Sequence, residues 1–298
     1  MKPNPFRRPL LLAALASFSL NIASAQSPRL PAWAARGELR KDVEFARPGG
    51  FALTLDAWVP EGAGPHSAVI IVHGGGWEAG DKTTYVPPLF PPLTNAGFAW
   101  FTINYRLAPK YPYPAAMEDV KAAVRWVKAH AAEYKVDPAR LALMGESAGG
   151  HLAALVGAMN EPDTAVAAVV PFYGLHDFGT IADNITRNRA AFLAITELND
   201  AARERIREAS PITYVRKGLP PFLMIHGTRD AAVPYDQSVM MCARLRLTGN
   251  ACELFTVEDA PHGMGAWEKE ARWQGYKEKM VSWLNERLRT RVTSSGAR

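Results

Sequence analysis

A serine flanked by glycines is the first feature of this chain that could do chemistry. Residues 145–149 read Gly-Glu-Ser-Ala-Gly, with Ser147 at the centre. A short apolar run precedes them at residues 141–144, and residues 151–156 have the composition of a helix. Glycines two positions to either side allow a serine to occupy a strained strand-to-helix turn, which exposes its hydroxyl at the helix N-terminus. The pattern predicts that Ser147 is a nucleophile.

A glycine run upstream could stabilise the negative charge that a serine nucleophile generates. Residues 69–72 predict a buried strand, and His-Gly-Gly-Gly-Trp follows at residues 73–77. Acyl transfer needs backbone N–H donors directed at the developing oxyanion, and consecutive glycines let the main chain approach a substrate closely. The amides of Gly75, Gly76 and Ala148 are therefore the predicted oxyanion hole. Taken alone, the glycine run is equally compatible with a plain turn.

An acid and a base each follow a later apolar segment. Asp230 comes just after the predicted strand at residues 221–226, and His262 follows the one at residues 252–257. Catalytic groups of open α/β sheets gather at the carboxyl ends of the strands, so these two side chains should meet Ser147. The order serine, aspartate, histidine along the chain is that of α/β-hydrolases.

Two further acids compete with Asp230 for the role of partner to the histidine. Glu258 and Asp259 lie directly before His262 in the sequence. So short a connection makes the reach of either carboxylate to the imidazole awkward, and Asp230 is favoured on geometry.

Four other polar residues are expected to have structural roles. His151 should pack beneath the serine turn, and His226 should be hydrogen-bonded at the end of its strand. Arg106 is expected to form a structural ion pair, and Asp119 to be a surface or paired carboxylate that supports the fold.

The elements that must position these residues alternate along the chain. A hairpin is predicted from residues 41–46 and 51–59, with Gly49 and Gly50 in its turn. Further strands are expected near residues 67–72, 98–104, 140–144, 166–172, 221–226 and 252–257. Helices are expected near residues 115–134, 147–159, 235–248 and 266–289. This alternation predicts an α/β fold with a mostly parallel sheet, right-handed crossovers and helices on both faces.

Two segments do not fit the alternation. Residues 174–213 mix apolar and charged side chains after a predicted strand, which favours a small cap of short helices that shapes the substrate pocket. An ordinary long connection without substrate contacts is the alternative. The proline-rich residues 85–92 form either a loop into the next helix or one wall of the active-site mouth.

Together these motifs resemble the α/β-hydrolases of the hormone-sensitive-lipase-like acetyl esterase group, close to bacterial secreted acetyl-xylan and feruloyl esterases. The segments that carry the likeness are residues 73–77, 104–109, 145–150, 226–230, 233–234 and 261–263. It extends over residues 40 to 290. Glu146 departs from the pattern, because many members have Asp before the serine. A short N-terminal region also leaves little material for a large helical cap.

The resemblance implies a serine carboxylic ester hydrolase that works through an acyl-enzyme. The implied substrates are small-molecule or polysaccharide esters, with short acyl chains or with the acetyl and feruloyl groups of plant polysaccharides. Two alternatives stay open: an amide hydrolase of the arylformamidase or exopeptidase type, and a non-catalytic binding protein on a hydrolase scaffold.

The first 25 residues have the composition of a bacterial secretory signal. Lys2, Arg7 and Arg8 precede an apolar run at residues 10–20 that is too short to span a bilayer, and small residues lead to a predicted cleavage after Ala25. Removing these three cations lowers the formal charge from +5 to +2, which weakens the case for nucleic-acid or membrane-surface binding. Residues 26–298 are expected to form one secreted or periplasmic catalytic domain without stable membrane insertion; a retained N-terminal anchor is the alternative. Oligomeric state is not predicted.

The two cysteines suit an exported protein. Cys242 is expected on a helix and Cys252 at the start of the next strand, so a disulfide would join helix to strand; two buried thiols are the alternative. The sequence has neither Cys-x-x-Cys nor His-Glu-x-x-His spacing, so no metal and no cofactor is expected.

Overall fold

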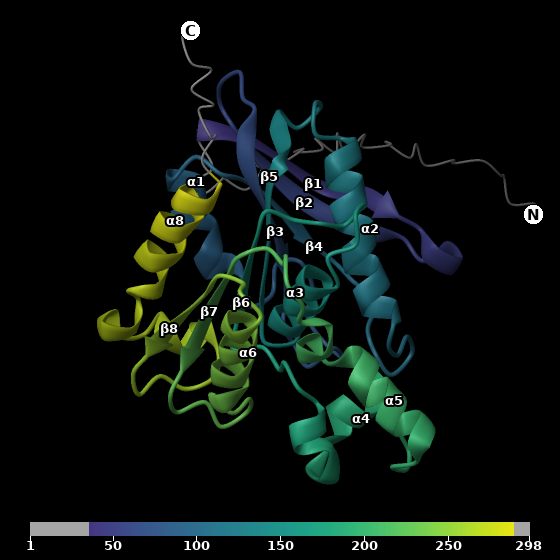
Figure 1. The fold of residues 1–298 in the computed structure, drawn as a ribbon. Helices are drawn as coiled ribbons and strands as arrows, with labels where there is room; N and C mark the ends of the chain where they lie inside the picture. The colour runs from purple at the N-terminus through teal and green to yellow at the C-terminus, as the bar shows by residue number, and fades with distance from the viewer. Residues whose placement is uncertain (1–35, 289–298) are drawn as a thin grey trace, which may run out of the picture.

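A single eight-stranded sheet forms the centre of the computed structural model, which describes residues 36–288 (Figure 1). The strands are β1 (Gly37–Ala46), β2 (Leu53–Pro60), β3 (His66–Val72), β4 (Ala99–Ile103), β5 (Val136–Glu146), β6 (Ala168–Phe172), β7 (Phe222–Gly227) and β8 (Cys252–Val257). They lie in the order β1-β2-β4-β3-β5-β6-β7-β8. Each of these strands was expected from the sequence.

The sheet is parallel except at one edge. β1 and β2 form the expected hairpin, and β2 pairs antiparallel with β4. From β4 to β8 every neighbouring pair is parallel. Helices cover both faces of this part, which is why residues 68–72 of β3 are an unbroken run of buried apolar residues instead of an alternating one.

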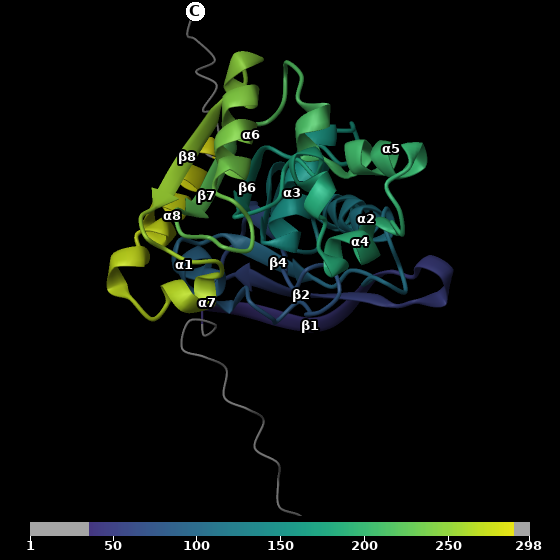
Figure 2. The ribbon, with the colours of Figure 1, turned by 90° about the horizontal axis from the view of Figure 1, so that it is seen from below.

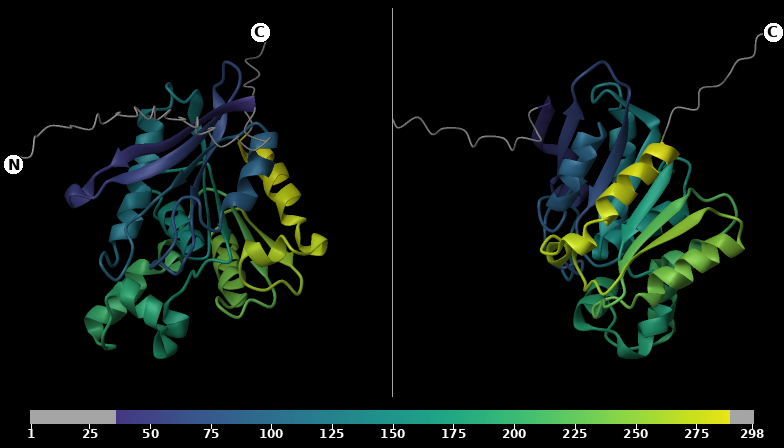
Figure 3. Two further views of the ribbon diagram at one scale, coloured as in Figure 1. Left: turned by 180° about the vertical axis from the view of Figure 1, so that it is seen from behind. Right: turned by 90° about the vertical axis from the view of Figure 1, so that its left-hand side faces the viewer.

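Helices lie in two layers, one on each face of the sheet (Figures 2 and 3). Helices α2 (Ala115–Ala129), α3 (Ala148–Met159) and α6 (Asp236–Leu247) contribute to one apolar core, whereas α1 (Phe90–Asn95), α7 (Met264–Trp267) and α8 (Tyr276–Arg287) contribute to the other. The doubly covered parallel sheet confirms the α/β-hydrolase fold class.

The helix expected near the end of the chain differs from the sequence expectation. The single helix predicted at residues 266–289 is divided into α7, a 3-10 turn at Ala271–Trp273 and α8. The indole N–H groups of Trp267 and Trp273 donate to the carbonyls of Pro261 and Glu258, so this segment follows the His262 loop instead of continuing one helix. The proline-rich stretch contains a 3-10 turn at Pro87–Leu89 and the start of α1.

A cap of short helices joins β6 to β7, as predicted for residues 174–213. It contains 3-10 turns at Gly179–Asn184 and Pro211–Tyr214, and the helices α4 (Arg187–Leu193) and α5 (Asp200–Ala209). In Figure 1 the cap lies beyond the end of the sheet where the parallel strands finish.

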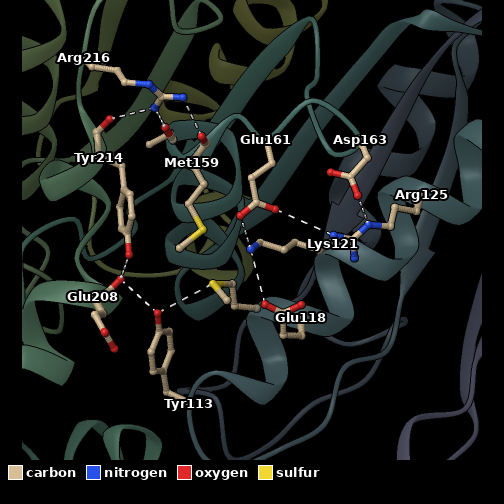
Figure 4. A network of polar contacts seen from close by, with 12 residues as sticks. Tyr113, Glu118, Lys121, Arg125, Met159, Glu161, Asp163, Glu208, Tyr214 and Arg216 are labelled. Atoms are coloured by element: carbon tan, nitrogen blue, oxygen red, sulfur yellow. Dashed lines mark hydrogen bonds and ion pairs between the residues drawn. The ribbon is translucent and has the colours of Figure 1, made fainter.

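Polar contacts attach the C-terminal end of the cap to the helices of the core (Figure 4). The hydroxyls of Tyr113 and Tyr214 both donate to the carbonyl of Glu208, at 3.1 and 2.8 Å. Arg216 donates to the carbonyls of Ala158 and Met159 at the end of α3, which satisfies acceptors that a helix C-terminus leaves free. The cap base is thereby held to α3, the helix that begins at the serine turn.

Ion pairs at the same place connect α2 with the segment after α3. Lys121, buried on α2, lies 2.8 Å from a Glu161 carboxylate oxygen, and Arg125 contacts Asp163 (Figure 4). Arg106 pairs with the buried Asp119 of α2 through both carboxylate oxygens, as expected for a structural ion pair.

The structure joins Cys242 of α6 to Cys252 of β8 in a disulfide. Within residues 36–288, no helix is both long enough and apolar enough to cross a membrane. The predicted signal and its cleavage after Ala25 lie outside the described residues.

Candidate active site

Ser147 occupies the sharp turn between β5 and α3. Its φ of 53° and ψ of −116° place a non-glycine residue in a strained region of backbone space. The flanking glycines are required by close approach: a Cβ at Gly145 would lie 2.3 Å from the Gly149 carbonyl oxygen, and a Cβ at Gly149 would lie 2.1 Å from that of Val72. These contacts explain the glycine spacing noted in the sequence.

The structure brings Ser147, His262 and Asp230 into one hydrogen-bonded chain. His262 Nε2 lies 2.9 Å from Ser147 Oγ, and His262 Nδ1 lies 2.6 Å from Asp230 Oδ2. The serine follows β5, the aspartate follows β7 and the histidine follows β8, so three parallel strands deliver the three groups to one edge of the sheet. The arrangement can move a proton from the hydroxyl to the imidazole.

Asp230 is held as a buried carboxylate. Its Oδ1 accepts hydrogen bonds from the backbone amides of Ala232 and Val233, and its Oδ2 also lies 3.3 Å from His226 Nε2. Burial alone would raise the pKa of Asp230, but hydrogen bonds from His226 and His262 hold it well below its usual range. The acid is therefore ionised at neutral pH.

The two competing acids point elsewhere. Asp259 pairs with Arg229 at 3.0 Å and with Arg272 at 3.9 Å. A carboxylate oxygen of Glu258 lies 3.4 Å from the hydroxyl of Thr228. Neither approaches the imidazole.

The predicted oxyanion loop lies beside the serine. Gly75 and Gly76 have φ values of 103° and 61°, which side chains rarely adopt, and both line the same cavity as Ser147, Ala148 and His262. Among the backbone hydrogen bonds of residues 36–288, none uses the amides of Gly75, Gly76 or Ala148 as a donor. These amides are free to receive an oxyanion.

Buried aromatic rings support this loop from below. Tyr105 stacks on the ring of His73 at 4.2 Å, and its hydroxyl donates to the carbonyls of His73 and Gly74. Trp77 donates from its indole N–H to His151 Nδ1, whose Nε2 donates in turn to the carbonyl of Ala209 in the cap. His151 is thus a structural link between loop and cap, and its burial lowers its pKa to about 4.

Glu146 lies buried directly under the nucleophile. The Gly74 amide and the Tyr173 hydroxyl donate to its carboxylate, and a Cβ on Gly74 would lie 1.8 Å from Glu146 Oε1. The Tyr173 hydroxyl also accepts from the amide of Met264, two residues beyond His262. Burial raises the pKa of Glu146 to about 7, although nearby His262 lowers it.

A cavity of about 660 Å³ opens above Ser147. Its lining comes from the oxyanion loop, the serine turn, the loop after Asp230, the His262 loop, Tyr85 and the cap. Tyr85 therefore places the proline-rich stretch at the mouth of the site, and the cap contributes Leu175, Thr186, Asn188 and Arg189. No cluster of three or more potential metal ligands occurs among the described residues.

Several supporting residues had no assigned role in the sequence. Tyr105 lay within a recognised motif, and Tyr173 follows the strand next to that of the serine. Their position at the carboxyl ends of β4 and β6 was the available signal. No sequence signal indicated a role for Asn188 or Arg189, because only the packing of the cap places them over the pocket.

Comparisons with solved structures agree with this geometry. A truncated carbohydrate esterase from gut microbiota superposes with a TM-score of 0.75 at 26% identity, over 87% of this chain and 99% of that one. A thermophilic esterase from Thermogutta terrifontis with butyrate bound gives 0.69 at 27% identity, over 85% and 95%. The same protein phosphonylated by sarin gives 0.70 at 26% identity, over 87% and 96%.

Curated relatives are esterases as well. Esterase LipQ of Mycobacterium tuberculosis (strain ATCC 25618 / H37Rv) is 36% identical over 226 residues, which cover 70% of this chain and 53% of the relative. The probable carboxylic ester hydrolase LipM of the same strain is 36% identical over 188 residues, 59% and 44% of the two chains. This chain thus spans about half the length of these relatives.

The model of the BD-FAE family matches residues 55–245, a stretch that begins in β2, ends in α6 and includes the oxyanion loop, the serine turn and the acid. On this match and this geometry, the chain belongs to the BD-FAE family of α/β-hydrolases.

Proposed function

We propose that this protein is a serine carboxylic ester hydrolase with Ser147, His262 and Asp230 as its catalytic triad. The observation that carries the proposal is the continuous chain of hydrogen bonds from Ser147 Oγ through both imidazole nitrogens to the Asp230 carboxylate. Support comes from the esterases among its relatives and structural neighbours.

The reaction starts with proton transfer. His262 Nε2 takes the proton of Ser147 as Oγ attacks the ester carbonyl carbon, and Asp230 stabilises the imidazolium that forms. The amides of Gly75, Gly76 and Ala148 donate to the oxyanion, and each such donor contributes about 3 kcal/mol of transition-state stabilisation. Collapse of the intermediate expels the alcohol, which takes the proton from His262 and leaves the acyl group on Ser147.

Water completes the cycle by the same route. His262 removes a proton from a water molecule as it attacks the acyl-enzyme carbonyl, and the second tetrahedral intermediate releases the carboxylic acid as the proton returns to Ser147. The cavity of about 660 Å³ has room for a short acyl group together with a sugar or aryl alcohol. Short-chain and carbohydrate esters are accordingly the proposed substrates.

Export from the cytoplasm belongs to the same proposal. The leader at residues 1–25 favours secretion or periplasmic location. The Cys242–Cys252 disulfide supports this, because such bonds persist mainly in oxidising compartments.

The test is hydrolysis of p-nitrophenyl acetate, butyrate and octanoate and of methyl ferulate, with Ser147→Ala alongside. We expect Ser147→Ala to lose about 10⁴-fold or more in kcat while it unfolds at the same temperature as the unaltered protein. Ser282→Ala, an exposed serine on α8, is the matched control and should keep full activity. Equal activity of Ser147→Ala would contradict the assignment. Cleavage of the matching amide, p-nitroacetanilide, without cleavage of any ester would favour the amide hydrolase.

A further inference from the structure

The cap presents two hydrogen-bond donors to the cavity above Ser147. Asn188 and Arg189 belong to α4 and line the same cavity as the serine and His262. Both side chains are half-buried, and each is held by a hydrogen bond to a neighbouring residue of the cavity wall, Thr186 for Asn188 and Ala232 for Arg189. This part of the cavity wall therefore holds two hydrogen-bond donors, one of which carries a positive charge.

Asn188 offers a hydrogen-bond donor to the cavity. Its Oδ1 accepts a hydrogen bond from the Thr186 hydroxyl at 2.6 Å, which leaves Nδ2 as the free end of the amide. That nitrogen lies over the oxyanion loop, because a Cβ on Gly76 would come 2.7 Å from it. The donor therefore lies within a few ångströms of the position that the ester carbonyl must take.

Arg189 adds a full positive charge. Its Nη2 donates to the carbonyl of Ala232 at 2.7 Å, which commits one of the five guanidinium N–H groups. Within residues 36–288 it forms no ion pair, whereas the neighbouring Arg187 pairs with Glu78. A half-buried guanidinium that lacks a carboxylate partner retains strong unused capacity for one.

The acids near the cavity are not available as carboxylate partners for Arg189. Asp230 is the acid whose charge acts on Arg189, but its carboxylate is already held by His262, His226 and two backbone amides. Glu146 is held beneath the nucleophile by the Gly74 amide and the Tyr173 hydroxyl. The loop that faces Arg189 supplies only Ala231, Ala232 and Val233 to the lining.

The geometry points to a carboxylate subsite formed by Arg189 and Asn188, so that the preferred substrate is an ester that carries a second, free carboxylate. A planar guanidinium fork matches a carboxylate in both shape and charge. The inference rests on the proposed esterase function and names its substrate class.

The carboxylate could belong to the acyl part or to the alcohol part of the ester, and two matched pairs of probes separate these sources. Mono-p-nitrophenyl glutarate against p-nitrophenyl valerate places a carboxylate or a methyl at the end of the same acyl chain. 6-Acetoxyhexanoate against hexyl acetate does the same at the end of the alcohol. The quantity measured is the ratio of kcat/KM for the anionic ester to that for the neutral ester.

For the unaltered protein we expect a ratio of about ten or more in at least one pair, since a hydrogen-bonded charge contributes about a tenfold change or more in affinity. In Arg189→Met the ratio should fall at least tenfold, and Arg189→Lys should restore part of it. Raised salt should lower the ratio in the unaltered protein. Arg187→Met, the exposed neighbour, is the matched control and should leave the ratio unchanged.

These measurements distinguish failure of the carboxylate subsite from failure of the proposed esterase function. If the unaltered protein cleaves none of the four esters, the proposed function fails. If it cleaves them without preferring the anion in either pair, or if Arg189→Met keeps the preference, the carboxylate subsite is wrong and the esterase stands.

Discussion

At the scale of single residues, Asp230 shows how an acid is kept ionised in a buried position. Two backbone amides hold Oδ1 while His262 and His226 contact Oδ2, so the charge stays stabilised without solvent. Because this charge orients the imidazole and stabilises its protonated form, we expect Asp230→Asn to lower kcat on p-nitrophenyl acetate by about 10⁴-fold. Asp259→Asn, which removes an exposed acid beside the same loop, should stay within about twofold. The reverse pattern would make Asp259 the acid.

Glu146 predicts a dependence of stability on pH. Burial raises its pKa from 4.5 to about 7, so the folded protein favours the protonated carboxyl. Its contribution to stability is fully present below pH 4.5 and is lost as the pH rises through 7, because the folded state must then hold a buried charge. The difference of about 2.5 in pKa corresponds to roughly 3 kcal/mol.

Replacing Glu146 with glutamine leaves a neutral side chain of the same shape, so this dependence on pH should disappear. Relative to the unaltered protein, the unfolding free energy of Glu146→Gln should therefore be higher at pH 8 than at pH 5, as measured by urea unfolding at both pH values. Tyr173→Phe tests the same hydrogen-bond network without changing the charge. If the difference in unfolding free energy between Glu146→Gln and the unaltered protein were the same at pH 5 and pH 8, the pKa of Glu146 would not lie between those values.

At the scale of elements, the disulfide joins α6 to the edge strand β8, which leads to the histidine. The cysteines are ten residues apart, and closing a loop of that length in the unfolded chain contributes about 3 kcal/mol. Cys242→Ser combined with Cys252→Ser should lose roughly that amount in urea unfolding. A reductant should destabilise the unaltered protein and leave the double variant unchanged; if both respond alike, the bond does not form.

The cap and the serine helix behave as one structural unit in this fold. Arg216 binds the carbonyls at the end of α3, and His151 on α3 joins the cap carbonyl of Ala209 to Trp77 of the oxyanion loop. Trp77 also stacks on Phe192 of the cap at 4.6 Å. The cap is therefore anchored at its base and beside the loop, which explains how short helices can present Asn188 and Arg189 at fixed positions.

At the scale of the whole molecule, export should divide the chain after Ala25. We expect the mature protein to begin at Gln26, because small residues at positions 23 and 25 suit signal peptidase. Mass spectrometry of the protein from the periplasm or medium of an expressing bacterium measures this directly. Ala25→Tyr should retain the leader and stay with the membrane fraction, and an intact N-terminus on the exported unaltered protein would favour an anchor.

The sequence by itself determined the α/β-hydrolase architecture and the segments that hold the candidate triad and oxyanion loop. Those signals are local: glycines where an added Cβ would lie within 2.5 Å of other backbone atoms, apolar runs that become parallel strands, and polar residues at the ends of those strands. The boundaries of the helix expected at residues 266–289 were wrong because two tryptophan hydrogen bonds to the His262 loop outweigh helical propensity there.

Only the tertiary structure decided which side chains complete the site. It brought Asp230, the acid favoured from the sequence, to 2.6 Å from the imidazole, and it put Glu146 in contact with Gly74 and Tyr173. It also placed Asn188 and Arg189 over the serine. These contacts join residues distant in sequence, so their existence depends on how the cap and sheet pack, and no local pattern of residue types encodes that packing.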